Sequence, residues 1–405
     1  MKKKIKTIIS TILLCFVLSG CSTGSNSHEI PLDSSSNCPI STKRTGTERQ
    51  GISNAGNSFE CTQDGAYFFY GNPYGGRWLL YVDHGSDTIY KLCGRPDCSH
   101  TDKDCNAYFN EASGICYYDG FLYTLNYPSI SIQSGDLIRM NLDGTERTVV
   151  YNTTEFMQAN KFRNVLMPSI INGVLFFMPS RLKDNGRTEL NNAYYKLDGS
   201  MDEAKTETMF NLFLYADGDN FIAPFYEEEG DTLTYCLWDP NEGIIEELFT
   251  TDLDHIGPYA YGYVGTNACY YVENGIIFED SYTEGRKELI NTGHTGDFQL
   301  VCFPDCIVMY DKGDPAYEEN TLLYFYDWNF NDLGSVKIDY PYDKQLVGFI
   351  CGETPDRIIL TDNYDSNPCY YINKSDLGTG NIEIHKFKLP DFGEDYFWSD
   401  ESDED

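Results

Sequence analysis

The sequence predicts an all-β protein built as a β-propeller of about seven four-stranded blades. Three observations lead to this prediction. The chain is rich in aromatic side chains, with 32 Tyr and 24 Phe among its 405 residues, and such residues favour strands. Short apolar segments alternate with turns through most of its length, as in all-β proteins. A turn that contains an acidic residue also recurs at a regular spacing, which is the signature of a repeat architecture.

The recurring turn sets the expected number of blades. Each unit contains aromatic strands, a turn with an acidic residue, and then a polar strand. The turn acids are Asp83, Asp143, Asp198, Asp239, Glu284, Asp332 and Asp376. Their mean interval of about 49 residues matches the length of one propeller blade. The fifth unit lacks the Asp-Gly turn of the others, so six or eight blades stay open, and a two-domain β-sandwich is the alternative architecture.

Two intervals between turns are longer than the rest, and each contains an insertion. The first holds a cysteine-rich segment after Leu92, and the second holds residues 157–163 and a polar loop from Arg181 to Asn192. The closure of the ring stays open, because either residues near Phe59 or the segment from Ile382 to Leu389 could supply the last strand.

The repeat also carries a resemblance to a known family. One copy reads Ile-Arg-Met-Asn-Leu-Asp-Gly from Ile138 onward. This pattern resembles the propeller repeats of TolB-like and related lipoproteins from Gram-positive anaerobes, many of which are known only as domains of unknown function. The resemblance covers about residues 59–390 and implies the propeller fold. It implies no particular activity, because one fold hosts many functions.

The first 20 residues are typical of a lipoprotein signal peptide. Four lysines precede a short apolar segment from Ile8 to Leu18, which is too short to span a bilayer of ~30 Å. The segment ends in Leu-Ser-Gly-Cys, so we expect cleavage before Cys21 and attachment of acyl chains such as palmitate to its thiol. Two or more chains anchor a protein stably. The alternatives are an ordinary secretory signal and an uncleaved anchor.

These features divide the chain into four parts. Residues 1–20 are the expected signal peptide, and residues 21–58 are the lipidated cysteine with a flexible linker. The propeller is expected over residues 59–390. Residues 391–405 form an acidic tail that we expect to be disordered. The protein is therefore predicted to lie on the extracytoplasmic face of the bacterial cell membrane, held by its lipid.

Charge and motif content narrow the function. The formal net charge of -34 excludes nucleic-acid binding through neutralisation of phosphates. The nucleophile elbow, the zinc-protease motif and the P-loop are all missing from the sequence. We therefore expect a monomeric, non-enzymatic protein that binds a glycan, a peptide or a protein partner. The first alternative is a polysaccharide hydrolase or lyase that uses carboxylates, and the second is a receptor associated with transport or envelope assembly.

One cluster could hold a metal ion. Cys93, Cys98, His100 and Cys105 lie within 13 residues, and three thiols with one imidazole suit a structural zinc ion. Their spacing departs from the common C-x2-C arrangement and requires a bent loop, which Gly94 and Pro96 could supply. A disulfide would also suit an extracytoplasmic protein. Zinc, a disulfide and free thiols are therefore all open for this cluster.

Other patterns are interpreted as structural. Asp327, Asn329 and Asn331 match the opening of a calcium loop, but the sixth and twelfth positions of the motif do not, so turn chemistry is expected. Cys302 and Cys306 could bridge across a turn.

Overall fold

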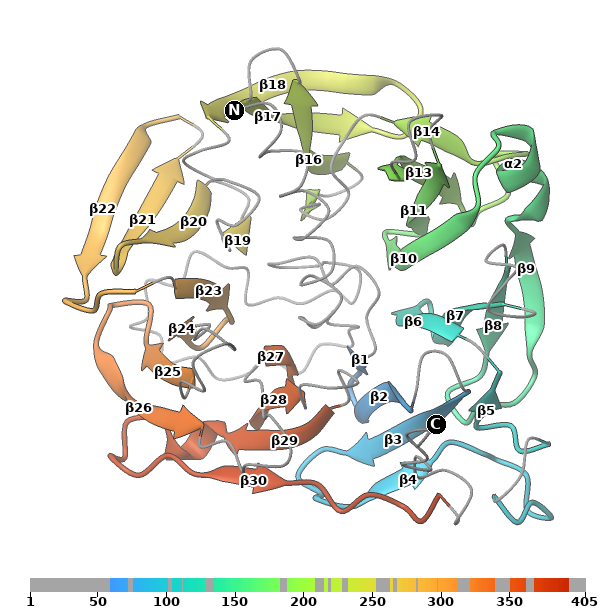
Figure 1. Ribbon diagram of the computed structural model, residues 1–405, viewed down its shortest axis with the longest axis horizontal. Helices are drawn as coiled ribbons and strands as arrows, with labels where there is room; N and C mark the ends of the chain where they lie inside the picture. The colour runs from blue at the N-terminus through green and yellow to red at the C-terminus, as the bar shows by residue number, and fades with distance from the viewer. Residues whose placement is uncertain are drawn as a thin grey trace, which may run out of the picture.

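The structure confirms a seven-bladed β-propeller. In this computed structural model the described strands form seven antiparallel sheets arranged in a ring (Figure 1). Among the described residues no helix is long and apolar enough to cross a membrane. The residues that the structure describes are 59–71, 76–100, 104–110, 112–127, 135–182, 188–207, 215–217, 220–227, 232–252, 263–264, 268–281, 283–296, 298–311, 321–338, 350–361 and 368–392.

Each blade uses strands that are consecutive in the chain. Blades one to four contain β1 (Phe59–Cys61), β2 (Gly65–Tyr70), β3 (Arg77–Asp83) and β4 (Ile89–Lys91); β6 (Ala112–Tyr118), β7 (Phe121–Asn126), β8 (Asp136–Met140) and β9 (Thr148–Asn152); β10 (Asn164–Ile171), β11 (Val174–Leu182), β13 (Asn192–Lys196) and β14 (Lys205–Glu207); and β15 (Tyr215–Asp217), β16 (Asn220–Glu227), β17 (Thr232–Asp239) and β18 (Gly243–Asp252). Blades five to seven contain β19 (Tyr263–Val264), β20 (Ala268–Glu273), β21 (Ile276–Ser281) and β22 (Gly285–Asn291); β23 (Phe298–Cys302), β24 (Ile307–Asp311), β25 (Thr321–Tyr326) and β26 (Asp332–Ile338); and β27 (Ile350–Glu353), β28 (Arg357–Thr361), β29 (Pro368–Asn373) and β30 (Ile384–Lys386).

The predicted insertions account for the elements outside this pattern. The cysteine-rich segment follows β4 and ends in β5 (Tyr108–Phe109), which pairs with β3. The second long interval contains helix α2 (Thr154–Ala159) and the short strand β12 (Thr188–Leu190), which pairs with β11. A single 3-10 turn, η4 (Lys374–Asp376), precedes β30.

The recurring acids lie at the hairpin between the third and fourth strands of every blade. In the second blade the Asp143 carboxylate accepts a hydrogen bond from the backbone amide of Thr145 at 3.0 Å. In the fifth blade the recurring acid is Glu284, but the turn acceptor is the Ser281 hydroxyl, which accepts hydrogen bonds from the amides of Thr283 at 3.3 Å and Glu284 at 3.2 Å. The doubt about the fifth unit is thereby removed, since this unit forms a complete four-stranded blade.

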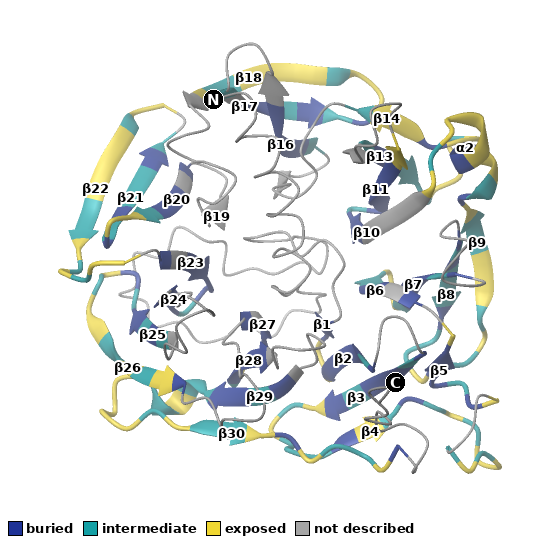
Figure 2. Cartoon of the chain, viewed as in Figure 1, coloured by how far each residue is buried: buried dark blue, intermediate teal, exposed yellow. Residues whose placement is uncertain are grey.

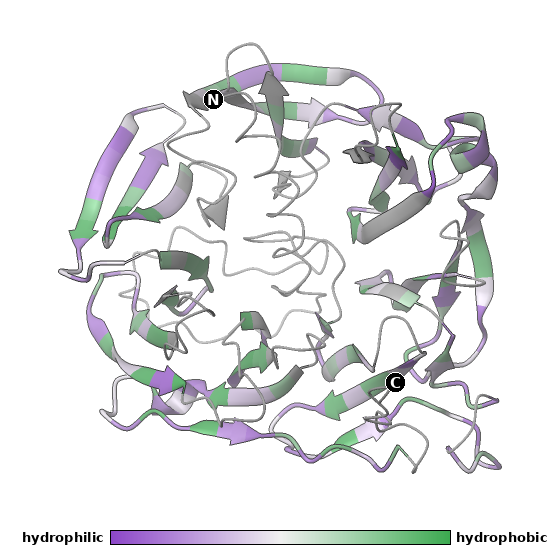
Figure 3. Ribbon diagram, in the orientation of Figure 1, coloured by the Kyte–Doolittle hydropathy of each residue, from purple (hydrophilic) through white to green (hydrophobic). Residues whose placement is uncertain are grey.

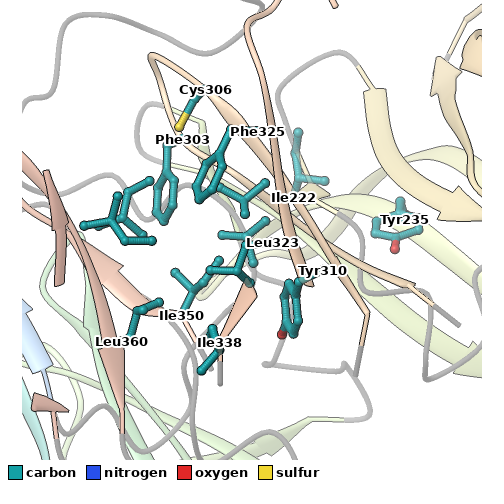
Figure 4. Close-up of a cluster of buried hydrophobic side chains, with 14 of the residues drawn as sticks. Ile222, Tyr235, Phe303, Cys306, Tyr310, Leu323, Phe325, Ile338, Ile350 and Leu360 are labelled. Atoms are coloured by element: carbon teal, nitrogen blue, oxygen red, sulfur yellow. The ribbon is translucent and has the colours of Figure 1, made fainter. Parts of the chain in front are cut away.

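Hydrophobic packing runs between neighbouring blades. The second strands are buried on both faces, as in β2, whereas outer strands such as β22 are largely exposed (Figure 2). The hydropathy of the residues follows the same radial order (Figure 3). Radial repetition covers the faces of each inner strand with adjacent sheets. One such cluster, shown in Figure 4, joins residues of the third, fourth, sixth and seventh blades, among them Ile222, Tyr235, Phe303, Cys306, Tyr310, Leu323, Phe325, Ile338, Ile350 and Leu360.

The ring closes without sharing a strand in the described part of the chain. Phe59 begins the inner strand of the first blade, and Ile384–Lys386 forms the outer strand of the last. Of the two predicted alternatives the second is confirmed, because the segment from Ile382 to Leu389 supplies the last strand of the last blade, whereas Phe59 belongs to the first blade. The residues after β30 then lie along β4, where the amide of Ile89 donates to the carbonyl of Lys388 at 3.0 Å.

The packed body extends slightly beyond the predicted boundary at residue 390. Phe392 is buried and stacks on Tyr70 with ring centroids 4.7 Å apart. Asp391 and Phe392, which we assigned to the acidic tail, thus belong to the region that packs on the first blade. The remainder of the tail and residues 1–58, which include Cys21, lie outside the described residues.

Candidate metal centre

The structure brings the four predicted ligands together. Cys93, Cys98, His100 and Cys105 lie in the connection between β4 and β6, and one donor atom from each lies within 4.8 Å of all the others. All three sulfurs are free thiols in the structure. A disulfide would use two of these thiols and would leave the imidazole without a role. The arrangement is compatible with a bound metal ion such as zinc.

The local chain conformation aims each sulfur inward. Each cysteine sulfur accepts a hydrogen bond from the backbone amide two residues later in the chain. The donors are Arg95 for Cys93, His100 for Cys98 at 3.4 Å, and Ala107 for Cys105 at 3.4 Å. Hydrogen bonds from backbone amides to sulfur stabilise the negative charge of a thiolate.

The bend that the sequence required is provided by His100 itself. This residue has a φ of 59°, in the left-handed region that non-glycine residues adopt uncommonly. Its carbonyl is held by the ammonium of Lys91 at 2.7 Å. The strained turn carries the imidazole back toward the sulfurs, so His100 joins the cluster although it lies only two residues after Cys98.

One measured spacing can be compared with a tetrahedral site. The Cys105 Sγ and His100 Nδ1 atoms are 3.6 Å apart. Zinc bonds of about 2.3 Å to sulfur and about 2.0 Å to nitrogen, at a tetrahedral angle, place these two ligand atoms about 3.5 Å apart. The pair already has the separation that a shared zinc ion requires.

The thiols differ in how readily they ionise. Burial opposes ionisation of Cys93, but the amides of Arg95 and Asn106 hold the pKa of its thiol below the ordinary value. Deeper burial raises the pKa of Cys105 to about 12. Of these two thiols, Cys93 therefore ionises more readily than Cys105.

Two cations that the sequence analysis missed lie beside the cluster. Lys91 and Arg147 each interact electrostatically with cysteines of the cluster. Burial lowers the pKa of Arg147 to about 10, and its guanidinium lies 4.0 Å from the centroid of the Phe109 ring. Lys91 could have been noticed from its place two residues before Cys93. Arg147 could not, because it belongs to the second blade.

Two further cysteines and two further histidines in the described part of the chain occupy structural positions. Cys302 and Cys306 are both buried and are not joined by a disulfide, so the suggested bridge across the turn is not formed. The Nε2 atom of His84 lies 2.9 Å from the carbonyl of Thr62. The His294 ring packs on an aromatic ring, with its centroid 3.9 Å from that of Tyr324.

The calcium-like segment is a hairpin turn, as expected. One carboxylate oxygen of Asp327 accepts bonds from the amides of Asn329 at 2.8 Å and Asn331 at 2.9 Å. The side-chain amide of Asn331 donates to the other oxygen at 2.8 Å. The carboxylate is therefore engaged in turn geometry.

Comparison with known proteins identifies no family. No family model and no curated protein sequence matches the chain. An uncharacterised protein of Listeria monocytogenes has a similar structure, with 10% identity, a TM-score of 0.42 and coverage of 67% of this chain and 83% of that one. The β-propeller domain of the trilobed protease of Pyrococcus furiosus has 14% identity and a TM-score of 0.41, with coverage of 68% and 84%. AztD of Citrobacter koseri has 11% identity and a TM-score of 0.39, with coverage of 82% and 86%. At these low similarities the comparisons assign no activity to the chain.

Proposed function

We propose that this chain is a lipid-anchored extracytoplasmic β-propeller that binds a glycan, peptide or protein partner without transforming it. In this proposal the monomeric ring is a rigid scaffold, its lipid holds it to the membrane, and a structural zinc ion braces its first blade. The binding role rests on one observation: the connections between the second and third strands of the blades are mostly longer than those between the first and second strands.

Connections between the first and second strands contain two to four residues in all seven blades. Those between the second and third strands are longer in most blades and reach nine residues at 127–135 and 312–320. Because antiparallel strands reverse direction at each turn, the two sets lie at opposite edges of the sheets. Long connections on a rigid scaffold are where binding residues concentrate. The ligand is therefore assigned to the edge that carries the second set.

Binding and turnover are separated by one experiment on the mature protein. A panel of soluble oligosaccharides and peptides is titrated by calorimetry, and each compound is then incubated with the protein and analysed for products. We expect saturable binding of at least one class and unchanged compounds. Turnover that is abolished by a single Asp or Glu substitution would instead establish the carboxylate hydrolase or lyase.

The anchor is tested separately. Membrane fractions of cells that express the full chain are analysed by mass spectrometry of the N-terminal peptide. We expect a peptide that begins at Cys21 and carries acyl chains, and we expect Cys21→Ser to release the protein from the membrane. An N-terminus that keeps the first 20 residues contradicts the proposal. A receptor role in transport or envelope assembly predicts neighbouring genes for such machinery.

The zinc ion is supported by the closed set of four donors and by the spacing of Cys105 and His100. Zinc in such a site has no redox chemistry and acts by cross-linking the chain. We expect about one zinc per chain in metal analysis of the purified protein, and loss of that zinc in Cys98→Ser. The control is Cys236→Ser, which removes a buried thiol outside the cluster. A metal-free protein whose mass is lower by two hydrogens per pair of cysteines would establish the disulfide.

A further inference from the structure

The segment after β30 holds the first and last blades together. Its main chain bonds to the first blade on both sides of Thr88, because the amide of Ile89 donates to Lys388 at 3.0 Å and the amide of Lys388 donates to Asp87 at 2.7 Å. Its aromatic residues Phe387 and Phe392 are buried. We call residues 387–392 the closing segment.

Lys91 connects this segment to the cysteine cluster. Its ammonium donates to the carbonyl of His100 at 2.7 Å. The same nitrogen lies 4.0 Å from the centroid of the Trp78 ring and 5.1 Å from that of Phe392. Cation–π contacts of this kind are attractive and strengthen where water is excluded. One side chain thus touches both the ligand loop and the end of the closing segment.

Hydrophobic packing makes a second connection. Cys105 belongs to the same buried cluster as Phe387 and Phe392, and Cys93 and Cys98 pack against that cluster together with Leu389. The segment after Cys105 also pairs with β3, where Tyr108 is opposite Trp78. A movement of the cysteine loop would therefore disturb the surface on which the closing segment lies.

The net charge of the metal-loaded cluster determines where the Lys91 ammonium lies. Three thiolates and a neutral imidazole around a divalent cation carry one net negative charge. Lys91 interacts electrostatically with both Cys105 and Cys98. A metal-loaded cluster therefore attracts the ammonium and favours the position in which it also contacts Phe392.

From these contacts we propose that the metal centre holds the ring closed between the first and seventh blades. We call this role the clasp. When zinc is bound, the ligand loop fixes Lys91, and Lys91 with the shared hydrophobic cluster holds the closing segment on the first blade. Loss of zinc releases residues 387–392 and opens the ring between the first and seventh blades. This inference rests on the zinc ion of the proposed function, but it goes further by assigning that ion a role in ring closure.

Hydrogen exchange of the full mature protein tests the clasp. Exchange is measured by mass spectrometry on the zinc-loaded protein and after removal of zinc with a chelator. We expect amides at Ile89 and Lys388 to exchange about 10-fold faster without zinc, which corresponds to about 1.4 kcal/mol of opening free energy. Amides of β16 and β17, on the opposite side of the ring (Figure 1), are expected to be unchanged.

A substitution separates the clasp from the metal itself. Lys91→Met keeps an apolar stem but removes the ammonium, so the protein is expected to retain about one zinc per chain and yet exchange faster at Lys388. The matched control is Lys196→Met in the third blade, whose ammonium contacts Asn241 and Asp198. It is expected to leave exchange of the closing segment unchanged.

Each contrary result has a distinct meaning. Zinc at about one per chain with unchanged exchange at Ile89 and Lys388 after its removal refutes the clasp and leaves the zinc site intact. Equal acceleration in β16 and β17 also refutes it, because zinc would then support the whole fold. A protein that binds no zinc refutes both the clasp and the proposed metal.

Discussion

Arg357 donates a hydrogen bond from its guanidinium to the main-chain carbonyl of Ser86, although the two residues lie 271 positions apart in the chain. The donor lies in the seventh blade, and the acceptor lies in the turn before β4 of the first. The guanidinium also lies over the ring of Tyr371, 4.1 Å from its centroid. This buried cation is a second point of closure for the ring, and it also lies 5.8 Å from the centroid of the Phe387 ring in the closing segment.

Arg357→Ala is expected to destabilise the protein by about 2–4 kcal/mol, because it removes a charge-assisted hydrogen bond and a cation–π contact. Urea unfolding followed by tryptophan fluorescence measures the change. The control is Arg139→Ala, whose guanidinium lies over Phe121 of its own blade at 4.6 Å. If the two substitutions cost the same, the contact between blades has no special role.

A buried ion network joins the sixth and seventh blades. Burial alone would lower the pKa of Lys374, but the carboxylates of Glu353 and Asp305 more than offset it and raise that pKa. The Lys374 ammonium lies 2.8 Å from the Asp305 carboxylate and contacts Glu353, which is 2% exposed.

Lys374→Met is expected to cost about 3–5 kcal/mol, because it leaves the carboxylate of Glu353 buried without its cation. Adding Glu353→Gln to this variant should restore a large part of the loss, since the only carboxylate left without Lys374 is then that of Asp305, which is partly exposed to solvent. Thermal unfolding of the single and double variants measures both effects. A double variant that is less stable than Lys374→Met would contradict the charge argument.

The turn of the fifth blade depends on a hydroxyl, whereas the turns of the second, third, fourth and sixth blades use a carboxylate as the acceptor. Ser281→Ala removes the acceptor for two amides and is expected to cost about 1 kcal/mol. Ser281→Asp keeps an acceptor at the same place and is expected to be neutral or stabilising. Urea midpoints compare the two variants, and equal destabilisation by both would show that the acceptor is not what stabilises this turn.

Buried tyrosines make the fold sensitive to alkali. Burial raises the pKa of Tyr151 and of Tyr326 from 10.0 to about 12. Between these values the unfolded chain loses phenol protons that the folded chain keeps, so stability is complete below pH 10 and is lost as the pH rises toward 12. We expect Tyr151→Phe to give a shallower decline of the unfolding free energy across this range.

The exposed Tyr90, at 52% exposure, provides the matched control for this alkaline effect. Tyr90→Phe is expected to leave the decline with pH unchanged. Chemical unfolding at stepped pH values, with tyrosinate absorbance followed in parallel, measures both variants. An unchanged slope in Tyr151→Phe would contradict the role of burial at that position.

The repeat architecture was predictable because each strand and each turn depends on residues that are close together in the sequence. A strand with two covered faces needs the continuous apolar run of residues 66–69, and a hairpin needs an acceptor such as Asp143 at its turn. These requirements act within a few residues, so they leave a readable period. In the fifth blade Ser281 provides the acceptor that an aspartate provides in other turns, and this weakened the sequence pattern of that blade without changing its fold.

The candidate site was predictable in its members but not in its surroundings. Cys93, Cys98, His100 and Cys105 are close in sequence, and their donor types already indicated a metal ion or a disulfide. Arg147 belongs to the second blade and is distant from the cysteines in the sequence, so no sequence spacing predicts that it lies beside the thiols.

By itself, the sequence determined the blade count to within one and the composition of the cysteine cluster. Only the tertiary structure decided how the ring closes and which cations face the thiols. Ring closure joins residues such as Ser86 and Arg357 from opposite ends of the propeller. Their pairing follows from the curvature accumulated over seven sheets, because each sheet adds its own rotation before the last blade meets the first.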